Sequence, residues 1–156
     1  MKKIVLSAAL LTLSYVGYGQ NTFYGGPNSP CTKEVWEELS EYEGPKEVEL
    51  VKLKEYPIQM RNFEGVPFSF NTSYVFSKNN SYTLFLNKYE DMGGDLTLRM
   101  FDNKDQEVTL TKEQTEMGER YTFWNEVTGI YHLVAYTKQE EAGCVMLGLF
   151  FNKSGE

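Results

Sequence analysis

The side chains that could do chemistry are few in this chain of 156 residues. The single histidine, His132, lies in the middle of an alternating stretch that predicts a β-strand. A lone histidine in a strand is typical of a structural residue, and a Ser-His-Asp triad could be assembled only from unrelated loops. The sequence has no Gly-x-Ser-x-Gly, His-Glu-x-x-His or Cys-x-x-Cys motif. No catalytic residue is therefore predicted.

Acidic side chains are plentiful, so a glycosidase-like site must be considered. Such a site needs two carboxyl groups about 5–10 Å apart in a cleft. The candidates are Glu90, Asp91 and Asp95, which flank the Gly93-Gly94 turn. Acids in turns also serve solubility, and a chain of this length has little material for a cleft. A small hydrolase that uses loop carboxylates is therefore kept only as an alternative function.

A second acidic cluster, residues 102–107, raises the question of calcium. Calcium takes about 6–8 oxygen ligands, which makes Asp102, Asn103 and Asp105 the candidate ligands. Lys104 lies inside the cluster, and the calcium-loop pattern Asp-x-[Asp/Asn]-x-[Asp/Asn]-Gly is missing. The other interpretation is a tight turn in which Asp and Asn side chains bond to the backbone. Both interpretations stay open, and no other cofactor is predicted.

Aromatic residues make up 15% of the chain and suggest a binding surface. Alternation places Trp124 on the strand face opposite Phe123. We expect Trp124 to lie on an outer face beside His132 and Tyr136 of the next strand. Exposed aromatic side chains on such a face stack on sugars or anchor protein partners. The alternative is that a second layer, such as the helix expected over 30–42, covers this face.

The N-terminus has the three parts of a secretory signal peptide, over residues 1–19. Met1-Lys2-Lys3 precedes an apolar run over 4–16, and Gly17-Tyr18-Gly19 precedes Gln20. The run is shorter than the roughly 20 residues that span a membrane, so we expect cleavage before Gln20 rather than an uncleaved anchor. The mature chain would then be exported to the periplasm, the cell surface or the medium, without membrane insertion. Residues 20–28 are predicted to form a flexible leader.

The formal net charge of −7 excludes one class of partner. An acidic chain without a cluster of lysine and arginine repels nucleic acid, so none is predicted as a partner.

The chain's two cysteines, Cys31 and Cys144, allow only one pairing. Export would expose them to an oxidising compartment, which favours a disulfide over two buried free thiols. A helix over 30–42 would place Cys31 on a buried stripe with Trp36 and Leu39. We therefore expect a bridge that ties this helix to the last strand.

The remaining sequence predicts a mainly β fold. From Phe68 onward, short alternating stretches are separated by turn residues at nearly even intervals. This pattern predicts an antiparallel β-sandwich of jelly-roll or immunoglobulin-like character, with residues 29–156 as one domain.

The boundaries of four segments complete this prediction. A first strand is expected over 46–56, ended by Pro57, with a connector over 58–67. A polar loop is expected over 111–119. The last strand, over 144–152, is apolar on both faces, which predicts a central position in its sheet.

Four blocks within 81–152 resemble a known group of proteins. They are Tyr82-Thr83-Leu84, Leu96-Thr97-Leu98-Arg99-Met100-Phe101-Asp102, Thr128-Gly129-Ile130-Tyr131-His132-Leu133 and Gly143-Cys144. The stretch resembles small exported proteins of Bacteroidota and is similar to the pre-peptidase C-terminal and Golgi-dynamics-type β-sandwiches. The resemblance covers about half of the chain and implies a β-sandwich. Because its motifs are turn and core motifs, it implies no activity.

Taken together, the sequence predicts an exported, non-enzymatic binding module for a protein or glycan partner in the cell envelope. Besides the small hydrolase, a structural subunit of an envelope complex is the other alternative. A hydrolase would need two acids lining one pocket, whereas an envelope subunit would co-purify with a membrane complex.

Overall fold

The computed structural model describes residues 31–41, 49–60, 68–89, 96–116, 118–137 and 143–153. The predicted signal peptide over 1–19, the predicted leader over 20–28 and the candidate acids Glu90, Asp91 and Asp95 lie outside the described residues. The elements are α1 (Lys33–Glu41), β1 (Leu50–Met60), β2 (Phe68–Phe76), β3 (Asn80–Lys88), β4 (Leu96–Phe101), β5 (Thr111–Thr115), β6 (Gly118–Asn125), β7 (Gly129–Thr137) and β8 (Gly143–Asn152).

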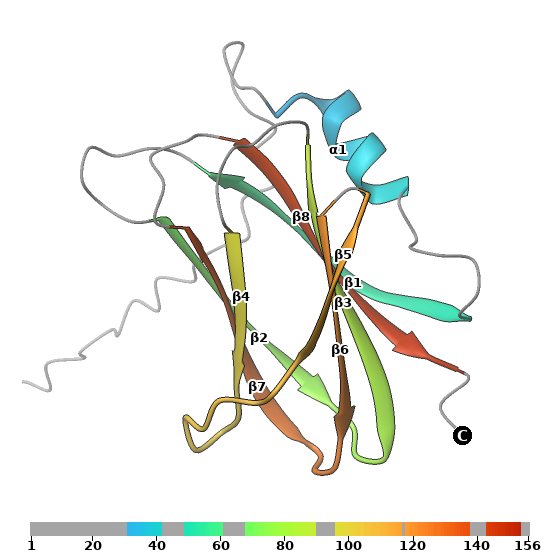
Figure 1. The fold of residues 1–156 in the computed structure, drawn as a ribbon, viewed down its shortest axis with the longest axis vertical. Helices are drawn as coiled ribbons and strands as arrows, with labels where there is room; N and C mark the ends of the chain where they lie inside the picture. Colours follow the sequence, from blue (N-terminus) through green and yellow to red (C-terminus); the bar gives the residue numbers. More distant parts are fainter. Residues whose placement is uncertain are drawn as a thin grey trace, which may run out of the picture.

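The strands form two antiparallel sheets that pack against each other (Figure 1). One sheet has five strands in the order β1-β8-β3-β6-β5, and the other has three in the order β2-β7-β4. The predicted β-sandwich with one short helix is therefore confirmed.

The core lies between the sheets because apolar residues alternate along the strands. On β4, Leu96, Leu98 and Met100 point inward and are buried, while the residues between them are partly exposed. Met100 lies opposite Leu133 of β7 in register, and neither is accessible to solvent. This strict alternation is what two half-buried sheets require.

Strand β8 departs from this alternation because both of its faces are covered. It pairs with β1 on one side and β3 on the other, which confirms its predicted central position. Val145 and Leu147 face the sandwich core. Cys144 and Met146 point to the opposite face and are buried under α1.

The helix is shorter at its start than the range predicted over 30–42. Thr32 caps α1: its Oγ1 accepts a hydrogen bond of 3.4 Å from the Val35 N–H. The other end is fixed to β1, since Lys52 Nζ donates to the Ser40 carbonyl at 2.9 Å and Ser40 Oγ donates to the Glu55 carboxylate.

The predicted boundaries of the first strand were wrong. β1 continues through Pro57 to Met60, so Ile58 and Met60, placed by prediction in a connector, are buried core residues. Proline is tolerated because β1 is an edge strand, where alternate N–H groups need no partner.

The polar loop predicted over 111–119 was also wrong. Most of it forms β5 and the start of β6. Four of the five residues of β5 are exposed, so this edge strand lacks the apolar alternation that would have revealed it.

Candidate binding surfaces

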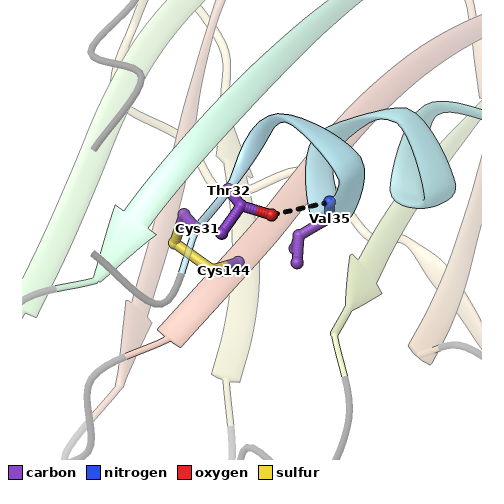
Figure 2. Close-up of a disulfide and its surroundings, with 4 residues drawn as sticks. All are labelled: Cys31, Thr32, Val35 and Cys144. Carbon is purple, nitrogen blue, oxygen red and sulfur yellow. Dashed lines mark hydrogen bonds between the residues drawn. A yellow bond between two sulfur atoms is a disulfide. The ribbon is translucent and has the colours of Figure 1, made fainter. Parts of the chain in front are cut away.

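The predicted disulfide is present between Cys31 and Cys144, whose Cα atoms lie 5.5 Å apart. Figure 2 shows Cys31 directly before α1 and Cys144 at the start of β8. Val35, Trp36 and Leu39 pack around the bridge and form a small second core with Met146. The helix thereby covers the Cys144 end of the outer face of the five-stranded sheet.

Trp124 lies on that same outer face beyond the helix, and 52% of the residue is exposed. In register it lies opposite Ser81 of β3, whose Oγ accepts a hydrogen bond of 2.7 Å from Asn152 Nδ2. The alternative that a second layer covers Trp124 does not hold, because the residue is exposed. Trp36 of α1 is buried against β8 instead.

The expected neighbourhood of Trp124, His132 and Tyr136 was wrong. Trp124 belongs to β6 of the five-stranded sheet, whereas His132 and Tyr136 belong to β7 of the three-stranded sheet. All three side chains point away from the core, so they lie on opposite outer faces of the sandwich. The connection over 126–128 crosses between the sheets, which alternation along a strand cannot reveal.

His132 is exposed, and its Nδ1 lies 2.8 Å from Ser73 Oγ on the neighbouring strand β2. A nucleophile and base pair of this kind needs a third group that orients the imidazole. No carboxylate of the described residues contacts the ring. The Ser73–His132 hydrogen bond is therefore interpreted as a polar link between neighbouring strands and not as a catalytic dyad.

The same outer face carries an ion pair between Arg99 of β4 and Glu107. Arg99 Nε donates to Glu107 Oε1 at 2.7 Å, and Nη2 donates to the second oxygen. These hydrogen bonds are the main cause that lowers the pKa of Glu107 and raises the pKa of Arg99. Both groups are exposed, so the pair contributes little stability.

The turn that contains the candidate calcium ligands Asp102, Asn103 and Asp105 is held by its own backbone. Asp102 Oδ1 accepts hydrogen bonds from the N–H groups of Lys104 and Gln106 at 2.8 and 2.9 Å. Asp105 adopts a left-handed conformation with φ of 59°. Within the part of the chain that the structure describes, no three acidic, histidine or cysteine side chains are grouped to hold a metal. The geometry fits the turn interpretation, and nothing in it supports calcium.

One buried carboxylate, that of Glu119, was missed by sequence reasoning. Glu119 points into the sandwich, where Lys112 Nζ lies 2.7 Å from its carboxylate and the Tyr121 hydroxyl donates to it. Burial, followed by this hydrogen bond, raises the pKa of Tyr121 well above 10. Alternation with Tyr121 and Phe123 could have placed Glu119 inward. One carboxylate paired with a lysine does not make the two-carboxyl site of a glycosidase.

The most exposed large hydrophobic residues gather at one end of the sandwich. Val75, Trp124, Val127 and Ile130 are 58%, 52%, 65% and 51% exposed. Val75 of β2 lies opposite Ile130 of β7 in register, and Val127 lies in the connection between Trp124 and Ile130. We call these four residues the apolar end.

Two connections lie side by side at the apolar end, at the bottom of Figure 1. The N–H of Asn79 donates to the Asn125 carbonyl at 2.6 Å, and the N–H of Lys78 donates to Thr128 Oγ1 at 2.9 Å. The β2–β3 connection thus supports the connection that carries Val127.

A buried tyrosine braces this arrangement. The Tyr131 hydroxyl lies 2.7 Å from Asn125 Oδ1 and 2.9 Å from the Val127 carbonyl. Asn125 Nδ2 in turn donates to the carbonyls of Ser77 and Val127. A tyrosine that bonds to the backbone a few residues upstream is similar to the tyrosine corner of other sandwiches. The connection that carries Val127 is therefore held in place by hydrogen bonds within the protein.

Comparison with known proteins found no matching family model and no matching curated protein. Among the described residues, no helix is both long and apolar enough to cross a membrane.

Proposed function

We propose that this chain is an exported, non-enzymatic binding module that docks a protein partner through the apolar end. The observation that carries the proposal is the clustering of Val75, Trp124, Val127 and Ile130, each more than half exposed, at one end. Large hydrophobic side chains that are exposed together in one region of a soluble domain mark interaction sites. The disulfide agrees with the proposed export, since such bonds persist in oxidising compartments.

The composition of the apolar end favours a protein over a glycan. Sugar-binding sites combine aromatic platforms with polar groups that bond to hydroxyls. Three of the four side chains here are aliphatic, and aliphatic groups offer a sugar neither stacking nor hydrogen bonds. Trp124 lies on the outer face of the five-stranded sheet, whereas Val75 and Ile130 lie on the outer face of the three-stranded sheet, and Val127 lies in the connection between the two sheets. An exposed tryptophan is typical of a protein–protein hot spot. The bracing by Tyr131 lowers the ordering cost of binding.

Site-specific photo-crosslinking in the native envelope tests the proposal. A photo-reactive residue replaces Val127, and the matched control replaces Val51 of β1, an exposed valine outside the apolar end. We expect one discrete protein adduct from position 127 and none from position 51, with mass spectrometry giving its identity. Equal adducts from both positions, or none from position 127, would contradict the proposal.

The identified partner then allows a quantitative test. Trp124→Ala should weaken its binding roughly 30-fold, the effect of a hot spot of about 2 kcal/mol, and leave the melting temperature unchanged. Binding to a glycan array that is lost in Trp124→Ala, without a protein adduct, would favour a glycan partner. An adduct that co-purifies with a membrane complex would favour a structural subunit of that complex.

A further inference from the structure

The sandwich has four edge strands, and three of them carry features that prevent pairing with another chain. Edge strands expose unpaired backbone groups, which proteins protect with charges, proline or bulges. β1 has Pro57 and a register irregularity just after Lys52. β5 carries Lys112 and Glu113, and the short β4 carries Arg99.

The fourth edge strand, β2, has none of these features. Its nine residues, Phe68–Phe76, include no charged residue and no proline, and they pair with β7 in unbroken register. Phe68, Phe70 and Tyr74 point inward and pack on the core but remain partly exposed. The β2 edge therefore combines a regular backbone, whose outer side pairs with none of the described strands, with aromatic side chains that are partly exposed.

We propose that β2 pairs with β2 of a second copy of this chain, in antiparallel orientation, joining two three-stranded sheets into one of six strands. The proposal rests on the edge itself and is independent of the function proposed for the apolar end.

The sequence of β2 suits pairing with itself about its central residue, Thr72. In this register Thr72 faces its own equivalent, and Phe70 faces Tyr74 of the second copy on the inner side. On the outer side Asn71 faces Ser73. Threonine pairs and aromatic pairs are favourable across antiparallel strands, and a two-fold axis makes each contact twice.

Charge is the reason to expect a second copy as the occupant. Two copies of a strand that has no charged residue meet without bringing like charges together, and β2 is the one edge among the described strands that has no charged residue. The net charge of −7 acts weakly at this contact, because salt screens charges beyond about 8 Å.

Sedimentation velocity of the exported protein, from roughly 1 to 200 µM to cover weak and moderate affinities, should show a reversible dimer. Two double variants test the register: Asn71→Lys with Ser73→Lys, and Asn71→Asp with Ser73→Asp. Both positions are exposed and point away from the core, so folding should be retained, as thermal melts would verify.

Each double variant alone should be monomeric, because like charges would face each other across the axis. An equimolar mixture of the two should recover a dimer. Gln114→Lys on the exposed β5 edge is the matched control and should leave the parent dimer intact.

A parent that stays monomeric over this range overturns the proposal, as does a dimer that survives both double variants. If both double variants are monomeric and their mixture stays monomeric as well, the proposed register about Thr72 is wrong. The protein identified by crosslinking at Val127 can also be added to the monomer. If it protects the β2 amides from hydrogen exchange, the edge of β2 binds a different protein and not a second copy, which overturns the proposal. Failure of the crosslinking at Val127 would leave these results unaffected.

Discussion

The disulfide allows the sharpest test of how the fold is held together. Cys31 and Cys144 are 113 residues apart, so the bridge closes nearly the whole described chain into one loop. In the chain-entropy model, a loop of this size destabilises the unfolded state by about 5 kcal/mol. Because whole domains are stable by only about 5–15 kcal/mol, this one bond is a large share of the total.

Replacing both cysteines, Cys31→Ala with Cys144→Ala, should therefore lower the free energy of unfolding by about 4–5 kcal/mol. The nine-residue α1 is too short to be stable alone, so it relies on the bridge and its small core to stay docked. Loss of the bridge should release the helix and expose Met146 as well.

Urea unfolding monitored by tryptophan fluorescence measures the effect, since Trp36 reports on the helix and the sheets report through circular dichroism. The two probes should coincide in the parent, and in the variant the helix signal should change at lower urea. Chemical reduction of the parent should reproduce the variant. A loss below about 1 kcal/mol, with α1 still docked, would refute the loop-entropy argument.

Three further results are expected. Trp36→Ala should cost about 3–5 kcal/mol in urea unfolding because Trp36 of α1 is buried between the helix and β8, whereas Trp124→Ala should cost no more than about 0.5 kcal/mol. Equal losses would contradict the burial assignment. Gly118→Ala should lower the free energy of unfolding by at least about 2 kcal/mol in the same assay. The φ angle of Gly118 is +152°, and a Cβ atom there would lie 2.1 Å from the Leu86 carbonyl oxygen. Unchanged stability would show that the strand can shift at this position. The pKa of Glu107 is lowered from 4.5 in the folded protein, chiefly by hydrogen bonds from Arg99. The small stabilisation by the Glu107 carboxylate is therefore present above pH 4.5 and is lost as the pH falls through the lowered pKa. The difference in melting temperature between the parent and Glu107→Gln should vanish in acid, and a difference that grows in acid would contradict the lowered pKa.

Much of the fold could be predicted because the relevant patterns are local. The stripe that contains Trp36 and Leu39 predicted the helix, and the alternation in β4 and β7 predicted which residues face the core. The expected export to an oxidising compartment, together with the count of two cysteines, predicted the disulfide. The local pattern did not predict β5, which is nearly all exposed, or the part of β1 after Pro57. Both are edge strands, where exposed polar residues and proline are tolerated.

The binding residues could not be grouped from the sequence for a different reason. Alternation assigns Trp124 and His132 to outward faces, but it cannot say that their consecutive strands belong to different sheets. The pairing of β2 with β7 places Val75 beside Ile130, and hydrogen bonds between the two connections hold the segment that carries Val127 at the same end.

The motif Thr128-Gly129-Ile130-Tyr131 links the fold to the proposed function. In the structure this motif supplies both a turn and a core residue, Tyr131. Tyr131 is buried and braces the connection, Thr128 accepts a hydrogen bond from the neighbouring connection, and Ile130 is exposed between them. The residues that specify the turn also hold the exposed hydrophobic side chains rigid. A partner that docks there would meet a preformed surface, so Trp124→Ala should act mainly on the dissociation rate of the complex rather than on association.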